Sequence, residues 1–311
     1  MQAVVFDGAL RLAEVSLPTL RPGEALIAPR LMGICATDVQ ITRGYMGFHG
    51  VLGHEFVGTV VACADAAWLG QRVVGEINCC DCGDWAARAQ CSQRTTLGIV
   101  GRDGAMSEQF ALPVANLHRV PDSVPDEAAV FAEPLAAALQ IVNQAHIRPN
   151  ERVAVVGDGK LGLLVAQVLR LTGAEITLVG RHPERWAVVE RQGSTATGDA
   201  GALPARGWDV VVECTGQATG LETSRRLVRP HGRLVLKSTF AGDVTLNLAP
   251  FVVDEITVIG SRCGPFAAAL RLLARGLIET APLLYARYPL AEAEAAFAAA
   301  HGQLKVVMHT K

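Results

Sequence analysis

The sequence predicts an α/β protein in which a doubly wound parallel sheet accompanies a β-rich region. Residues 151–185 follow the order strand, tight turn, helix, strand, which is typical of a βαβ unit. Residues 1 to about 120 instead hold short valine-rich segments separated by glycine and proline turns. The chain has 311 residues and half are apolar, so it is long enough for two domains with separate cores.

The turn between the first strand and the helix carries the sequence GDGKLG at 157–162. It follows the apolar run VAVV, which is typical of a strand buried on both faces of a parallel sheet. Gly157 allows a tight turn, Gly159 lets the backbone approach a pyrophosphate, and Gly162 lets helix and strand pack closely. The helix N-terminus at Lys160 and Leu161 attracts an anion. In this context the motif favours dinucleotide binding over an ordinary glycine turn.

The end of the second strand bears on the choice of coenzyme. A site for NAD usually carries Asp or Glu there, bonded to the ribose 2′-OH. Here strand 176–179 is followed by Gly180, Arg181 and His182. Arg181 could pair with a 2′-phosphate through two hydrogen bonds. The sequence therefore predicts NADP(H) in preference to NAD(H), with an adenine-stacking or solvent-facing Arg181 as the alternative.

Composition and charge exclude several classes of protein. The net charge is −2 with no basic stripe, so nucleic acid is not an expected partner. No apolar run reaches the roughly 18 residues that would span a membrane. The N-terminal residues lack the pattern of a signal peptide, so a cytoplasmic protein is expected. The eight cysteines are accordingly expected to be thiols or metal ligands.

The order of the expected elements suggests a discontinuous first domain. The tail is expected to form a helix at 266–275, a strand at 284–288, a helix at 290–300 and a strand at 304–308. We expect this tail to return to the N-terminal β-rich region rather than to extend the nucleotide sheet. The predicted domains are therefore 1–145 with 265–311, and 146–264.

Two motifs in the β-rich region contain metal-ligand residue types. Cys35 lies in GICATD, and His54 and Glu55 lie in GHE. Cysteine and histidine are good zinc ligands, and a catalytic zinc takes three protein ligands plus water or substrate. Glu55 and Glu133 are candidate carboxylate ligands, and Glu133 precedes a proline, which places it at a helix junction. Taken singly, each of these residues could be an ordinary core or surface residue.

The motifs GICATD, GHEFVG, FAEPLA and VVGDGKLG stand in the order and spacing of a known family. The chain resembles the zinc-dependent medium-chain dehydrogenase/reductases, most closely the branch of sorbitol, threonine and glucose dehydrogenases. The resemblance covers essentially the whole chain, including ECTG, LVLKST and IGSRCGPF. It implies a GroES-like catalytic domain, a Rossmann domain, and a homodimer or homotetramer.

The resemblance also implies individual roles. Cys35 and His54 would ligate the catalytic zinc, Glu55 would be a direct or nearby ligand, and Glu133 would be the extra glutamate of this branch. Thr37 would take the alcohol proton, and the neighbouring Asp38 would orient the histidine ligand. The implied coenzyme contacts are Gly157, Gly159, Lys160, Leu161, Gly162, Gly180, Arg181, His182, Thr215 and Ser238, with Ser261 and Arg262 near the nicotinamide amide.

Two departures from the family pattern stand out. The cysteine lobe is shortened to Cys79, Cys80, Cys82 and Cys91. Four thiolates suffice for a structural zinc, but neighbouring cysteines cannot both ligate without unusual backbone geometry, so the question stays open. In addition, Gln40 stands where some alcohol dehydrogenases have a relay histidine, so Thr37 would pass its proton to the ribose or to solvent.

These observations predict a zinc-dependent oxidoreductase. It would transfer a hydride between an alcohol, secondary or polyol, or its carbonyl product, and NADP(H). A zinc-free, quinone-reductase-like NADPH oxidoreductase and a non-catalytic NADPH-binding protein are the alternatives. The sequence leaves the substrate and the physiological direction open.

Overall fold

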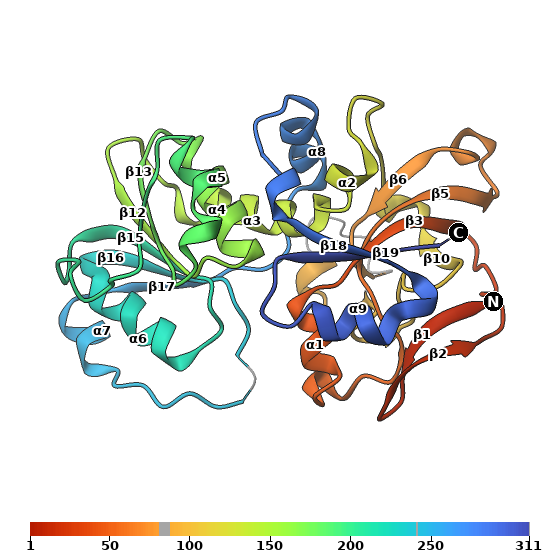
Figure 1. Cartoon of the computed structure of the whole chain (residues 1–311), viewed down its shortest axis with the longest axis horizontal. Coiled ribbons are helices and arrows are strands. Elements are labelled where there is room, and N and C mark those ends of the chain that lie inside the picture. The colour runs from red at the N-terminus through yellow and green to blue at the C-terminus, as the bar shows by residue number, and fades with distance from the viewer. Residues whose placement is uncertain (81–87, 241, 311) are drawn as a thin grey trace. The chain divides into compact units, whose positions relative to one another are not determined.

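A computed structural model of the chain describes residues 1–80, 88–240 and 242–310 (Figure 1). The chain divides into two compact units, Met1–Glu133 with Phe266–Lys311, and Pro134–Pro265. The second unit thus begins at Pro134, whereas the sequence placed the boundary at residue 146. Within the described residues, no helix is long and apolar enough to cross a membrane.

The first unit is built on a sheet with the order β11-β6-β5-β3-β19-β18, in which β10 also pairs with β3. Small sheets β2-β1-β4 and β7-β8-β9 complete its β-structure. Its strands are β1 (Gln2–Phe6), β2 (Leu10–Glu14), β3 (Glu24–Gly33), β4 (Gly50–Val51), β5 (Glu55–Cys63), β6 (Arg72–Gly75), β7 (Asn78–Cys79), β8 (Thr95–Leu97), β9 (Gly101–Arg102), β10 (Phe110–Pro113), β11 (Leu117–Arg119), β18 (Leu284–Pro289) and β19 (Lys305–His309). Its helices are α1 (Ala36–Ile41), α2 (Asp126–Ala129), α8 (Phe266–Ala274) and α9 (Ala293–Ala299).

The C-terminal strand β19 joins the N-terminal sheet. It pairs antiparallel with β3, with Val307 opposite Gly33 and Met308 opposite Met32. The buried side chains of Met32, Val306 and Met308 belong to one apolar core, which also includes Phe297 of α9. The predicted return of the tail to the N-terminal region is therefore confirmed. Burial of these apolar side chains stabilises the pairing of β19 with β3.

The second unit is a six-stranded sheet in which every neighbouring pair is parallel. The order is β14-β13-β12-β15-β16-β17. Its strands are β12 (Arg152–Val156), β13 (Glu175–Val179), β14 (Thr195–Thr197), β15 (Trp208–Glu213), β16 (Val228–Leu236) and β17 (Thr257–Gly260). Its helices are α3 (Ala132–Ala145), which starts just before the unit, α4 (Lys160–Arg170), α5 (Ala187–Glu190), α6 (Ala218–Leu227) and α7 (Ala249–Val253).

This strand order is the doubly wound arrangement, so the predicted Rossmann fold is confirmed. In Figure 1, α4 and α5 are seen above the central strands and α6 and α7 below them. The run Val153–Val156 is buried, as expected for a strand covered on both faces. From β12 the strand order grows in opposite directions, through β13 to β14 on one side and through β15 to β17 on the other. The crevice at the carboxyl ends of the strands beside such a switch point is where ligands bind in this fold.

Candidate active site

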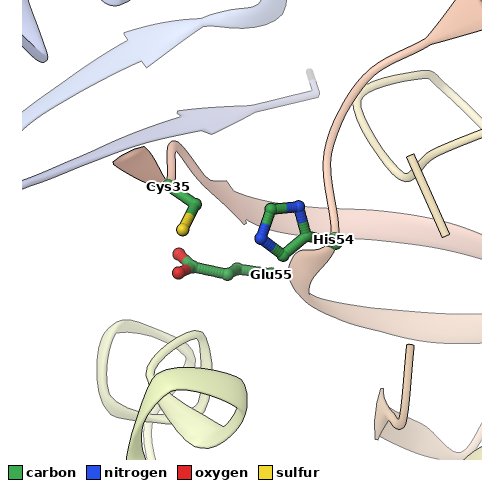
Figure 2. Close-up of side chains that lie close together, drawn as sticks. All are labelled: Cys35, His54 and Glu55. Atoms are coloured by element: carbon green, nitrogen blue, oxygen red, sulfur yellow. The ribbon is translucent and has the colours of Figure 1, made fainter. Parts of the chain in front are cut away.

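The three predicted zinc ligands lie together in the first unit. Cys35 is the N-cap of α1, just after β3, while His54 and Glu55 stand at the start of β5. Strands β3 and β5 are antiparallel, and their register places Gly33 opposite Glu55. Because Cys35 follows Gly33 by two residues, the strand pairing brings it to His54 and Glu55. Figure 2 shows the thiol, the imidazole and the carboxylate turned toward one another.

The geometry of this cluster fits a metal ion. One ligand atom from each of Cys35, His54 and Glu55 lies within 4.8 Å of the other two. Ligand bonds to zinc are about 2.0 to 2.3 Å, so atoms at this spacing can share one ion. His54 and Glu55 are buried, while Cys35 is partly exposed. A thiol, an imidazole and a carboxylate are the donor types that zinc takes.

The buried carboxylate of Asp38 supports two of these ligands at once. Its Oδ2 accepts a hydrogen bond of 2.8 Å from the backbone N of Cys35. Its Oδ1 lies 3.2 Å from Nδ1 of His54. Burial by itself lowers the pKa of His54, but the negative charges of Asp38 and Cys35 outweigh burial and raise that pKa well above its usual value. The Asp38 carboxylate therefore lies beside Nδ1 of the ring, which leaves Nε2 for a ligand.

The predicted coenzyme residues gather at one edge of the second unit. Parallel pairing aligns Val156 with Val179 and with Glu213, and Glu213 with Leu236. The residues that follow these strand ends, including Thr215 and Ser238, therefore emerge at the carboxyl edge of the sheet. Oε1 of Glu213 accepts hydrogen bonds from the backbone N atoms of Thr215 and Gly216 at 2.6 and 3.1 Å, which orders this loop.

The glycines of the turn have the backbone roles that the motif predicts. Gly157 has a φ of +118°, which only glycine adopts readily. A Cβ on Gly162 would lie 1.8 Å from the carbonyl O of Gly157, so only glycine allows this close approach of helix and turn. A Cβ on Gly159 would meet nothing within 4 Å, so space stays open at the N-terminus of α4. Lys160 and Leu161 begin that helix, and the N-terminus of a helix attracts an anion.

An acidic side chain that the sequence analysis did not predict lies at the end of β13. The carboxylate of Asp158, inside the glycine turn, accepts hydrogen bonds from the backbone N atoms of Arg181 and His182 at 2.8 and 2.6 Å. It also contacts the ring Nδ1 of His182 and Nε1 of Trp186. The predicted preference for NADP(H) considered only the residues that follow β13 and left out this acid from the turn. The sequence signal was present, because Asp158 lies between two glycines in the nucleotide turn.

Comparisons with known proteins cover both units. Residues 21–122 match the alcohol dehydrogenase GroES-like domain, and residues 161–275 match the zinc-binding dehydrogenase domain. The chain is 32% identical to an erythritol/L-threitol dehydrogenase of Mycolicibacterium smegmatis, over 94% of this chain and 92% of that protein. It is also 32% identical to an L-threonine 3-dehydrogenase of Streptomyces coelicolor, over 96% and 95%.

The chain belongs to the zinc-type medium-chain alcohol dehydrogenases.

A solved structure agrees with this membership. A protein assigned as a zinc-binding dehydrogenase from Sinorhizobium meliloti, bound to NADP, superimposes with a TM-score of 0.87 and 30% identity. The alignment covers 99% of this chain and 98% of that one. The matched domains and this superposition confirm the expected GroES-like and Rossmann folds. The family is one of oxidoreductases.

Two other predicted site residues lie in the first turns of helices. Thr37 is half-buried in the first turn of α1, next to Asp38. Glu133 is in the first turn of α3, after the short break that separates this helix from α2. Glu133 is not part of the three-residue ligand group. Its role as an additional ligand in this zinc-type dehydrogenase stays a prediction.

The shortened cysteine lobe of this dehydrogenase is only partly described. Cys80 and Cys91 form a disulfide, and Cys79 is buried with its Sγ 3.6 Å from Nδ2 of Asn116. Cys82 lies outside the described residues. A disulfide between Cys80 and Cys91 departs from the expectation that all the cysteines are thiols or metal ligands, and as a bonded pair these two sulfurs are not available as thiolates.

Sequence reasoning also missed a buried cation beside the ligand group. Lys305 of β19 is fully buried, and its Nζ donates to Oε2 of Glu55. The same Nζ lies 5.6 Å from the ring centre of Phe131. A single lysine within the apolar run of the last strand was the available signal, but its partner became visible only with the pairing of β19 and β3.

Proposed function

We propose that the protein is a zinc-dependent oxidoreductase that transfers a hydride between an alcohol, or its carbonyl product, and a nicotinamide coenzyme. The observation that carries the proposal is the convergence of ligand atoms of Cys35, His54 and Glu55 on one point. The glycine turn at the N-terminus of α4 supports the coenzyme part. A zinc ion held by the three ligands would supply Lewis-acid chemistry at the substrate oxygen.

The chain's own residues would prepare this site in three ways. Cys35 and His54 would hold the ion, and Asp38 would keep both in place through the Cys35 backbone N and the His54 ring. Burial of His54 and Glu55 would keep bulk water from the ligand atoms. Thr37, one residue before Asp38, would accept the proton of the alcohol and pass it to the coenzyme ribose or to solvent, since Gln40 cannot relay it as a histidine does.

Glu55 would alternate between two partners. In the structure its carboxylate pairs with the ammonium of Lys305. When zinc is bound, Glu55 would either ligate it or stay with Lys305 and leave a position for substrate. Lys305 would thus set how readily Glu55 gives up the metal to an incoming ligand. Glu133 is a further carboxylate that we propose as an alternative ligand.

The substrate class we propose is a secondary alcohol or polyol, or the matching carbonyl compound. The support comes from the relatives, whose names state that they act on erythritol, L-threitol and L-threonine. In each of these substrates a secondary hydroxyl has a polar neighbour. The proposal extends only to this class and leaves the individual substrate open.

Two observations bear on the coenzyme in opposite directions. The sequence prediction of NADP(H) is supported by Arg181 and by the NADP found on the Sinorhizobium meliloti relative. NAD(H) is favoured by Asp158, which supplies at the end of β13 the acid that the prediction assumed to be missing. The coenzyme component of the proposed function is therefore NAD(H) or NADP(H), and Asp158 is the residue on which the choice depends.

The zinc part is tested by measuring metal and turnover together. We expect one zinc per chain by elemental analysis of protein never exposed to chelator. In Cys35→Ala we expect this zinc to be lost and turnover to fall by at least about 100-fold, because one of the ligands has gone. Cys63→Ala is the matched control, since Cys63 is a thiol at the far end of β5, and it should keep both zinc and activity.

Other outcomes identify the alternatives. Full activity in Cys35→Ala would exclude the zinc mechanism. A zinc-free protein that still oxidises NADPH with quinones is the outcome expected of a quinone-reductase-like enzyme. Tight coenzyme binding without turnover on a broad alcohol and carbonyl panel would indicate a non-catalytic binding protein. Two zinc ions per chain would place a second ion in the cysteine lobe and contradict the Cys80–Cys91 disulfide.

A further inference from the structure

The side chain of Asp158 crosses from the glycine turn to the loop that follows β13. Its Oδ2 accepts hydrogen bonds from the backbone N of Arg181 at 2.8 Å, from the backbone N of His182 at 2.6 Å and from Nε1 of Trp186 at 3.1 Å. Its Oδ1 lies 3.0 Å from Nδ1 of His182. Asp158 is buried, so the carboxylate is held at this point rather than free to turn into solvent.

These donors are the groups that a coenzyme 2′-phosphate would need. The adenosine ribose lies at the end of the second strand of a Rossmann unit, where its 2′ substituent meets the residues after that strand. In this chain those residues are Gly180, Arg181 and His182, and two of their backbone N–H groups already donate to Asp158. A phosphate would lose these donors and also meet a carboxylate of the same sign of charge.

Gly180 gives independent evidence that the acid is built into this place. A Cβ atom on Gly180 would lie 2.2 Å from Cγ of Asp158, so no residue larger than glycine fits opposite the carboxylate. The end of β13 therefore lacks a side chain of its own because Asp158 fills that space from the turn. The acid expected at the strand end is present in the structure but comes from an earlier position in the sequence.

We infer that Asp158 is a specificity-determining residue that makes the coenzyme site select NAD(H) over NADP(H). Its second oxygen, Oδ1, has acceptor capacity left for a ribose hydroxyl, because a carboxylate oxygen can accept more than one hydrogen bond. The side chain of Arg181 is exposed, and its backbone N–H is one of the groups that donate to Asp158. The inference rests on the proposed function only in assuming that the Rossmann unit binds a nicotinamide coenzyme.

The test is the relative affinity of full-length protein for NADH and NADPH, measured by fluorescence titration. We expect the wild type to bind NADH at least about tenfold more tightly than NADPH, as like charges brought together weaken binding by this order or more. Asp158→Asn keeps the size of the side chain and removes its charge. We expect it to tighten NADPH binding about tenfold and to leave NADH within about threefold.

A matched control separates the effect of losing one unit of net charge from the effect of losing it at position 158. Glu184 lies in the same loop, in the 3₁₀ turn Pro183–Arg185, with an exposed side chain. Glu184→Gln removes the same unit of charge and should leave the NADPH-to-NADH ratio within about twofold, because an exposed charge is screened. If Glu184→Gln shifted the ratio as far as Asp158→Asn, the effect would be one of net charge and the inference would be overturned.

A second measurement needs no variant and covers the case in which Asp158→Asn does not fold. Adenosine 5′-monophosphate and adenosine 2′,5′-bisphosphate differ only in the 2′-phosphate, and each is used to displace NADH from the wild-type protein. We expect the monophosphate to displace NADH at least about tenfold better. Better displacement by the bisphosphate, or a ratio that Asp158→Asn leaves unchanged in folded protein, would overturn the inference.

These readouts are independent of alcohol turnover and of zinc. If neither NADH nor NADPH binds, the proposed function fails in its coenzyme part. If both bind and NADPH binds more tightly, only the role assigned to Asp158 fails. Moving the acid gives a final check: Asp158→Gly with Gly180→Asp should restore the preference for NADH that Asp158→Gly loses, because glycine at 158 also removes the Cβ that would clash at 180 and the carboxylate then comes from the strand end.

Discussion

Lys305 and Glu55 form an ion pair whose two side chains are both buried beside the ligand group. Removing charges from water is costly, and such a pair is held together only while both partners are present. Glu55 thus has a cation beside it. The pair balances the charge of a buried carboxylate.

We expect Lys305→Met to lower the free energy of unfolding by about 3 to 5 kcal/mol, because it leaves the buried Glu55 carboxylate without its ammonium. Denaturant unfolding of the metal-free protein measures this. The double variant Glu55→Gln with Lys305→Met removes both charges and should recover at least half of the loss. A Lys305→Met protein as stable as the wild type would show that the ion pair contributes nothing.

At the scale of elements, the turn and helix α4 assign different tasks to two glycines of one motif. Gly162 allows the helix to approach the carbonyl of Gly157, whereas Gly159 faces open space at the helix N-terminus. Gly162 is needed by the fold itself. Gly159 is needed for the ligand, since the space beside it would receive the pyrophosphate.

Replacing each glycine by alanine should therefore affect a different property, stability in one variant and coenzyme affinity in the other. Gly162→Ala forces helix and turn apart, and we expect a loss of about 1 to 3 kcal/mol of stability without any coenzyme present. Gly159→Ala should unfold like the wild type but bind coenzyme at least about tenfold more weakly. Thermal unfolding and coenzyme titration of both variants measure these effects. Equal stability of the two variants would contradict the assignment.

At the scale of the whole molecule, strand β17 is an unpaired edge of the Rossmann sheet in the described chain. Val258 is 48% exposed, and Val252 and Val253 of the neighbouring helix α7 are 76% and 79% exposed. Exposed apolar side chains beside an open strand edge mark a surface that tends to pair. We propose that two copies of the chain associate through β17.

We therefore expect the wild type to sediment as a dimer or a larger assembly, and Val258→Arg to shift it toward the monomer, because a charge on an edge strand opposes pairing. Analytical ultracentrifugation measures the mass. Leu17→Arg is the matched control, since Leu17 is also exposed but lies in the first unit, and it should leave the assembly unchanged. A monomeric wild type would contradict the proposal.

Much of this molecule follows from local patterns in the sequence. Strands β13 and β19 occur within one residue of the predicted ranges 176–179 and 304–308, because short runs rich in β-branched residues between turns leave few other arrangements. The glycine spacing at 157–162 predicted the turn and helix α4. The motifs also predicted that Cys35, His54 and Glu55 would share a site, because the family resemblance supplied their spatial relation.

Other features depend on residues that the fold brings together from distant positions. Lys305 meets Glu55 across 250 positions of sequence, and only the pairing of β19 with β3 places it there. Asp158 reaches the end of β13 because Gly157 turns the chain back and Gly180 leaves room. No periodicity or spacing rule encodes such contacts, since they depend on the direction of a side chain within the folded unit.

The sequence by itself determined the family, the two kinds of fold and the residue types that can hold zinc and a dinucleotide. Local propensity and motif spacing suffice for the strand, turn and helix of the nucleotide unit, because these depend on neighbours along the chain. The resemblance of the motifs to a known family supplied the family and the GroES-like fold. The tertiary structure alone decided which charges face each other, Lys305 toward Glu55 and Asp158 toward the loop after β13. Charges interact through space and not along the chain, so the neutralisation of Glu55 and the acid beside the coenzyme loop became visible only in the folded protein.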